Sequence, residues 1–129
     1  MAAANSGSVG RGKTFNETHT MRTETVETYW IKLYFSGPIE VAKQIIREDC
    51  FAKGLCVTVD PTTFIYTGGE EAGYVVGLIN YPRFPTDIVE IFNRAESLAM
   101  KLLEGTFQKS CLMMGPNFTK WYSTEKNEL

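Results

Sequence analysis

The chain contains a single histidine, and its 15 acidic residues outnumber its 13 lysines and arginines. That histidine, His19, lies in a polar N-terminal stretch, so we expect no Ser/His/Asp or Cys/His catalytic arrangement inside the folded part. Surfaces that bind duplex nucleic acid normally carry a basic excess, whereas the net charge here is −2. We therefore predict no duplex nucleic acid partner, no catalytic residues and a chain that is not an enzyme.

Long apolar runs and paired cysteines are also missing. No run reaches the roughly 18–20 apolar residues that cross a bilayer, which argues against a membrane partner. Residues 1–10 lack the charged and apolar regions of a signal peptide, so we expect a cytoplasmic protein. Cys50, Cys56 and Cys111 are odd in number and lack metal-ligand spacing, which indicates reduced, buried thiols. No metal and no cofactor is expected.

The 129 residues suffice for one domain. Residues 1–24 are rich in small and polar types and predict a flexible tail, residues 25–123 a single α+β domain, and residues 124–129 a C-terminal tail. Within the first tail, residues 7–14 (GSVGRGKT) match the phosphate-loop pattern. A working phosphate loop needs a strand before it and a helix after it, and neither is expected here, so we interpret the match as chance.

The first half of the domain shows a strand, a helix and a second strand. Alternation predicts a strand over residues 26–35, with Ile31, Leu33 and Phe35 on one face. Ser36 is a candidate helix cap, and the helix that follows runs to about Lys53 and stops at Gly54. The next strand, residues 55–60, is interrupted by Pro61, which indicates an edge position or a bulge there, with pairing resuming over residues 63–66.

The second half repeats the pattern. Residues 67–71 predict a hairpin turn in which two glycines supply positive φ. Residues 72–80 are apolar on both faces and predict a central strand that is covered on both sides. A second helix is expected from Thr86 or Asp87, with Asp87 and Glu90 as a capping pair. Residues 110–114 and 118–122 predict a final strand, broken or extended.

This order of elements is that of the ferredoxin-like split βαβ plait, an antiparallel sheet with two helices on one face. The other face of the sheet would carry Trp30 and Tyr34 from the first strand and half of the third strand, and much of it is apolar. Because an isolated domain leaves such a surface in water, we predict a homo-oligomer.

The segment between the third strand and the second helix is the strongest candidate site. Asn80, Tyr81, Arg83 and Phe84 lie between or beside two prolines that stiffen the backbone. An arginine fork suits phosphate and aromatic rings suit bases, and the amides that open the next helix could face an anion. Further candidates follow in a second set and in the hairpin: Asn117, Lys120, Trp121, Tyr122, Tyr66 and Gly69. We predict a small phosphorylated nucleotide as the ligand of these residues.

Three other readings stay open. Glu70 and Glu71 form a carboxylate pair that could serve a small nucleotide hydrolase, although a solvated hairpin tip explains them as well. Aromatic residues on the first and third strands are faintly similar to RNA-recognition modules, but Glu70 and Glu71 precede the third strand where those modules carry basic charge. The element order, together with Gly37, also fits a regulatory domain of the ACT type.

Residues 66–85, YTGGEEAGYVVGLINYPRFP, resemble a segment of small, uncharacterised phage-encoded proteins, and the resemblance extends over about residues 29–122. By size, expected oligomerisation and shortage of catalytic groups, the chain is similar to phage anti-defence sponges. That resemblance implies a protein that binds and sequesters a nucleotide second messenger, such as a cyclic oligonucleotide or cyclic ADP-ribose derivative, without cleaving it. The alternative is an interaction protein that blocks a host enzyme through its apolar sheet face.

Overall fold

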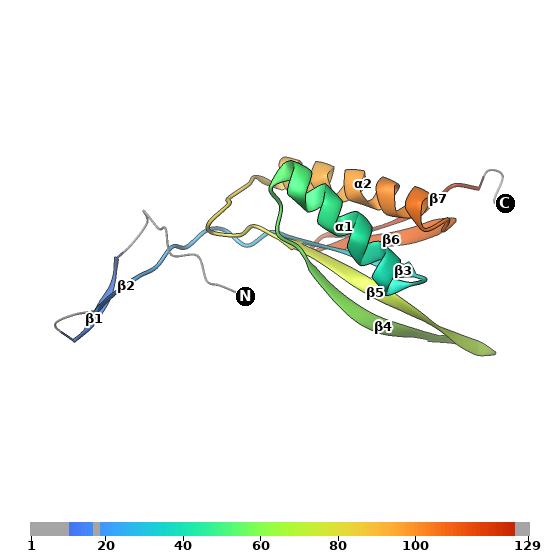
Figure 1. Ribbon diagram of the computed structural model, residues 1–129, viewed down its shortest axis with the longest axis horizontal. Coiled ribbons are helices and arrows are strands. Elements are labelled where there is room, and N and C mark those ends of the chain that lie inside the picture. Colours follow the sequence, from blue (N-terminus) through green and yellow to red (C-terminus); the bar gives the residue numbers. More distant parts are fainter. Residues whose placement is uncertain (1–10, 17–18, 126–129) are drawn as a thin grey trace.

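The computed structural model describes residues 11–16 and 19–125, with side chains from Thr20 onward. Its main sheet has five antiparallel strands in the order β4-β5-β3-β6-β7. The strands are β3 (Trp30–Ser36), β4 (Thr58–Tyr66), β5 (Gly69–Ile79), β6 (Ser110–Gly115) and β7 (Phe118–Ser123). The helices α1 (Ile39–Lys53) and α2 (Ile88–Gly105) cover the same face of this sheet (Figure 1). The predicted α+β plait is confirmed, and β7 adds an edge strand beyond it.

The core lies between the sheet and the helices. Ile31, Leu33 and Phe35 of β3 point to the helices and are buried, as the alternation predicted. The rings of Phe35 and Tyr74 stack across β3 and β5 with their centroids 5.5 Å apart. From α2, Ala95 and other apolar residues at helical spacing complete the core. Each fully buried large side chain contributes on the order of 1.5–3 kcal/mol, so this layer dominates the stability of the domain.

The helix ends follow local chemistry. Gly54 ends α1 in the left-handed conformation, with φ 69°. At its start, the prediction of Ser36 as a cap is wrong: Pro38 occupies the cap position, and the Ser36 hydroxyl bonds Oε1 of Gln108 at 3.2 Å. For α2 the predicted cap is confirmed, because the Asp87 carboxylate accepts from the Glu90 amide at 2.7 Å.

The β4–β5 hairpin differs from expectation in three respects. β4 runs through Pro61 without a break, because an edge strand leaves one side of its backbone unpaired and proline needs no partner there. The turn is tighter than predicted: Gly68 alone takes a positive φ, 89°, and Gly69 already belongs to β5. β5 is central, as predicted, but its second face is not covered, and Ile79 on that face is 54% exposed.

The N-terminal segment contains a second, two-stranded antiparallel sheet formed by β1 (Arg11–Asn16) and β2 (His19–Arg22). This hairpin lies apart from the main sheet at the end of an extended segment (Figure 1). The predicted tail therefore includes two strands, and its flexibility stays a prediction. Residues 11–14 of the phosphate-loop match lie in β1, and a strand rather than a helix comes next; the rest of that match lies outside the described residues.

Two further expectations concern the whole chain. Cys111 is buried and Cys50 is partly buried, but Cys56 is exposed, so the prediction of buried thiols is wrong for Cys56. Within residues 11–16 and 19–125, neither helix is both long and apolar enough to span a bilayer.

Candidate functional site

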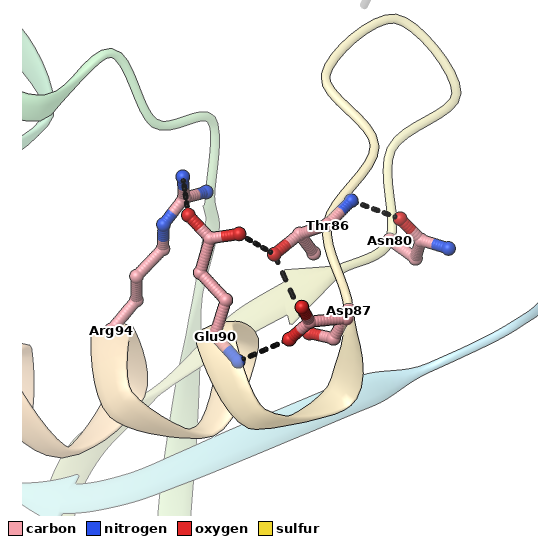
Figure 2. Close-up of polar contacts among 5 residues, drawn as sticks. All are labelled: Asn80, Thr86, Asp87, Glu90 and Arg94. Atoms are coloured by element: carbon pink, nitrogen blue, oxygen red, sulfur yellow. Dashed lines mark hydrogen bonds and ion pairs between the residues drawn. The ribbon is translucent and has the colours of Figure 1, made fainter.

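Asn80, the first of the predicted ligand-binding residues, is buried and connects two segments of the backbone through hydrogen bonds. It is 8% exposed. Its Nδ2 donates to the carbonyl of Glu27 at 2.7 Å, and its Oδ1 accepts from the Thr86 amide at 2.8 Å (Figure 2). Both ends of the side-chain amide are thus engaged in tying the chain before β3 to the chain before α2.

The start of α2 is already occupied by the chain's own carboxylates. Besides the Asp87 cap, Glu90 accepts from the Thr86 hydroxyl at 2.8 Å and pairs with the Arg94 guanidinium at 2.8 Å (Figure 2). Two carboxylates beside the helix N-terminus repel a third anion. This arrangement argues against the idea that the α2 amides bind a phosphate.

The remainder of the loop packs on itself. The rings of Tyr81 and Phe84 stack with centroids 5.8 Å apart, and the Arg83 guanidinium lies 5.9 Å from the Phe84 ring centroid. The adjacent cavity, which Tyr81 and Phe84 help to line, measures about 20 Å³, enough for a water molecule but not for a nucleotide. Arg83 is exposed and does not line that cavity.

The other predicted residues lie elsewhere. Tyr66 and Gly69 pair at the hairpin end of β5, whereas Asn80 follows the opposite end of that strand. Lys120 and Trp121 are neighbours on β7 but face opposite sides of the sheet, because successive side chains of a strand alternate. The structure therefore divides the predicted residues among several places: Asn117 and Lys120 line a common cavity and the Lys120 ammonium lies 5.2 Å from the Tyr122 ring centroid, whereas Trp121 faces the other side of the sheet. Their role in ligand binding stays a prediction.

The uncovered face of the sheet carries a hollow of about 210 Å³, which we call the open-face hollow. It lies over strands β3, β6 and β7. Leu112 of β6 pairs with Tyr34 of β3 on one side and with Trp121 of β7 on the other, so the three side chains form a row. On the side of the β4–β5 hairpin, the paired residues Phe64 and Glu71 complete it. Three aromatic side chains and one carboxylate thus surround a concave patch of sheet.

Glycine at position 73 allows the Phe64 ring to take its place at this hollow. Gly73 is paired with Ser36 on one side and Thr62 on the other, and all three face the uncovered side. A Cβ at Gly73 would collide with the Phe35 carbonyl oxygen and with the ring of Phe64. The Phe64 ring therefore lies across the space that a side chain at position 73 would fill, and only glycine permits that close approach.

Glu71 is the one charged residue among those that line the open-face hollow. Its neighbour Glu70 pairs with Ile65 and points to the other face of the hairpin, away from the hollow. The two carboxylates, which the sequence presented as a pair, are therefore separated by the pleat. Glu71 adds negative charge to a site without lysine or arginine among its lining residues, which favours a cationic or hydroxyl-rich ligand over a phosphate.

Burial makes two thiols and one phenol poor nucleophiles. Burial raises the pKa of Cys111 to about 11, and burial also raises the pKa of Cys50. Burial, reinforced by a 2.6 Å hydrogen bond from the hydroxyl to Glu96, raises the pKa of Tyr122. Each group is therefore neutral near pH 7. Among the residues that the structure describes, no cluster of three or more His, Cys, Asp or Glu side chains is arranged to hold a metal ion.

Comparisons with known proteins give a fold but no family. No family model and no curated protein sequence matches the chain. Among solved structures, a phage SAM lyase in complex with S-methyl-5'-thioadenosine superposes with a TM-score of 0.66 at 12% identity, covering 84% of this chain and 98% of that one. A phage SAM lyase in the apo state gives a TM-score of 0.58 at 13% identity, covering 75% and 90% of the two chains. At this level of identity the likeness shows a shared fold.

That likeness contradicts the prediction that the chain is not an enzyme. The prediction rested on the shortage of histidine and of other catalytic groups. A lyase uses the same fold over almost its whole length, so a small plait of this kind is compatible with catalysis.

Proposed function

We propose that the chain binds an adenosine-type ligand in the open-face hollow and acts as a lyase on S-adenosylmethionine (SAM). The observation that carries the proposal is the placement of one carboxylate, Glu71, among the aromatic rings of Tyr34, Phe64 and Trp121. The shared fold with a SAM lyase that holds S-methyl-5'-thioadenosine supports the choice of ligand.

Each part of such a ligand finds suitable chemistry in the hollow. Adenine offers a flat face for stacking, and Trp121, which is 59% exposed, is available to receive it. A carboxylate commonly accepts hydrogen bonds from ribose hydroxyls, a role that Glu71 can fill. Because SAM carries a net positive charge, Glu71 also attracts it electrostatically, with no lysine or arginine among the lining residues to oppose it.

The reaction that fits this site needs little acid or base catalysis. One carboxylate oxygen of the methionine part attacks its own Cγ, the Cγ–S bond breaks, and the electron pair of that bond stays on sulfur. The products are S-methyl-5'-thioadenosine and homoserine lactone, with no water consumed and no proton transferred. The positive sulfonium and the negative carboxylate both become neutral, so aromatic walls that exclude water favour the transition state.

Sequestration of a cyclic nucleotide without cleavage, the function inferred from the resemblance to sponges, fits the hollow less well. Cyclic nucleotides carry phosphates, and the one charged lining residue is the acidic Glu71. A phage origin, a cytoplasmic location and assembly into a homo-oligomer remain predictions. Assembly through the apolar sheet face would deepen the hollow and shield it from water.

The test is a product assay on the full-length chain. Purified protein is incubated with SAM, and S-methyl-5'-thioadenosine and homoserine lactone are measured by mass spectrometry against the spontaneous decay of SAM. Glu71→Gln keeps the shape but removes the charge, and we expect kcat/KM to fall by about 10–100-fold. Glu70→Gln, one residue away on the other face of the hairpin, is the matched control and should stay within about twofold of the wild type.

Three outcomes would count against the proposal. Formation of S-methyl-5'-thioadenosine no faster than the spontaneous rate would exclude the lyase activity. Equal loss in Glu70→Gln and Glu71→Gln would remove the open-face hollow from the site. Incorporation of ¹⁸O from labelled water into homoserine, with no lactone at early times, would replace the intramolecular displacement by hydrolysis.

A further inference from the structure

A second and larger cavity lies on the opposite side of the sheet. Its volume is about 630 Å³, within the range of about 300–1,000 Å³ that is usual for small-molecule sites. We call it the helix-side cavity. It lies between the first turns of α2, the start of β3 and the turn that joins β6 to β7, and its lining includes Ile31, Ile88, Val89 and Phe118.

The walls of this cavity are apolar and partly open to water. Ile88 is 55% exposed and Val89 is 65% exposed, unusual values for two adjacent β-branched residues on the first turn of a helix. Phe92 meets Phe118 edge to face with ring centroids 5.9 Å apart, which fixes one wall. An apolar ligand that fills this cavity removes apolar surface from water, which lowers the free energy of the complex.

One charged residue lines the cavity. Lys120 is the only charged residue among those that line it, so no carboxylate among the lining residues faces a bound group. The ammonium lies 5.1 Å from the Phe92 ring centroid and 5.2 Å from that of Tyr122, which holds it at the wall. Asn117 contributes the neighbouring polar side chain.

The ion pair that Lys120 makes is weak. Its Nζ lies 3.9 Å from Oε2 of Glu96, and both side chains are more than one-third exposed. That same oxygen accepts a 2.6 Å hydrogen bond from the Tyr122 hydroxyl. An exposed pair at this distance contributes little, so the Lys120 ammonium is available to an anion that enters the cavity.

We infer that the helix-side cavity is a second ligand site, separate from the open-face hollow, and that it takes an apolar anion: a flat or aliphatic body with one carboxylate or sulfonate. The body replaces water against Ile88, Val89, Phe92 and Phe118, and the acidic group meets Lys120 and Asn117. The site does not depend on the proposed lyase activity, because Lys120 and Trp121 face opposite sides of β7.

Two probes that differ by one charge test this inference. 8-Anilinonaphthalene-1-sulfonate carries a sulfonate, and N-phenyl-1-naphthylamine is the same body without it. We expect the sulfonate to bind the full-length chain saturably and more tightly than the neutral probe. Lys120→Met should lower the affinity for the sulfonate probe by about tenfold, since it removes one charge-assisted contact. The affinity for the neutral probe should not change. Lys43→Met, on α1 and not among the residues that line the cavity, is the matched control and should change neither probe.

A wall variant completes the test. Val89→Asp should fold normally because Val89 is exposed. The new carboxylate in the cavity wall should abolish the binding of both probes. Equal affinity for the two probes, or no effect of Lys120→Met on the sulfonate, would overturn the inference of an anion site. Sulfonate binding that falls as protein concentration rises, together with self-association in sedimentation, would instead assign the cavity to a second copy of the chain.

Discussion

Replacing Asn80 by alanine tests whether the loop between β5 and α2 stabilises the fold. The side chain is 8% exposed and makes two hydrogen bonds, of 2.7 Å to the Glu27 carbonyl and of 2.8 Å from the Thr86 amide. Each contributes about 1 kcal/mol net, and a buried group that loses its partner costs about 1–3 kcal/mol. Because the side chain is not completely buried, water can replace part of the lost hydrogen bonding.

The expected effect of Asn80→Ala is therefore a decrease of about 2–3 kcal/mol in the free energy of unfolding. For a domain of this size that corresponds to a Tm lower by about 8–12 °C. The assay is urea unfolding followed by circular dichroism, with thermal melts as a second measurement. Asn93→Ala is the control, because Asn93 is exposed on α2 and should change stability by no more than about 0.5 kcal/mol.

The same variant separates the structural role from the ligand role that the sequence suggested. With Asn80 tying the loop together, Asn80→Ala should leave the affinity for S-methyl-5'-thioadenosine within about twofold below its melting temperature. A variant that melts within about 2 °C of the wild type but loses tenfold or more in affinity would refute the reasoning and restore Asn80 to the binding site.

Three further predictions address the cap, the core and the hollow. Asp87→Ala removes the α2 cap and should cost about 1 kcal/mol in urea unfolding; no loss would mean that Glu90 alone suffices at the helix start. Burial raises the pKa of Tyr74 to about 12 and that of Cys111 to about 11, so both stay neutral in the fold while the unfolded chain ionises them near their ordinary values of 10.0 and 9.0. Stability should therefore fall as pH rises from about 9 to 12, and Tyr74→Phe should reduce this fall between about pH 10 and pH 12; an unchanged slope there would contradict the assignment. Gly73→Ala should destabilise by about 2 kcal/mol or more and abolish ligand binding, because its Cβ meets backbone and the Phe64 ring, whereas Gly77→Ala should be milder, since its Cβ meets only the movable Thr58 hydroxyl at 2.6 Å.

Local sequence signals predicted the fold well because each element carries its own. β3 alternates buried and exposed residues, so Ile31, Leu33 and Phe35 identified its inner face. The Asp87 and Glu90 spacing located the start of α2, and Gly54 located the end of α1. Such signals depend on residues within a few positions of one another, which a single sequence shows directly.

The candidate site could not be predicted in this way, because its members meet only through sheet order and register. Tyr34, Glu71 and Trp121 come from three strands, and their proximity follows from pairing between β3 and β5, β3 and β6, and β6 and β7. The predicted turn over residues 67–71 also hid the pairing of Phe64 with Glu71, which a two-residue turn at Thr67 and Gly68 would have indicated.

The loop between β5 and α2 shows a second limit of a single sequence. A sequence shows which residue types are present but not which of their hydrogen-bonding groups are already used. Both ends of the Asn80 side-chain amide form hydrogen bonds with backbone groups, and the Tyr81 and Phe84 rings stack on each other. A rigid loop can thus be built from the same residue types as a nucleotide site.

The two tryptophans provide the most direct test of where the ligand binds. Trp121 lines the open-face hollow, whereas Trp30, at the start of β3 with its ring beside the Lys32 ammonium, is not among the residues that line it, so the two indole N–H resonances distinguish binding in the hollow from binding elsewhere in a ¹H–¹⁵N spectrum. Trp30→Phe assigns the two signals. On titration with S-methyl-5'-thioadenosine, we expect the Trp121 indole to shift to saturation while the Trp30 indole stays in place. A spectrum in which Trp121 does not move at saturating ligand, or in which only Trp30 moves, would contradict the central claim that the open-face hollow is the nucleoside site.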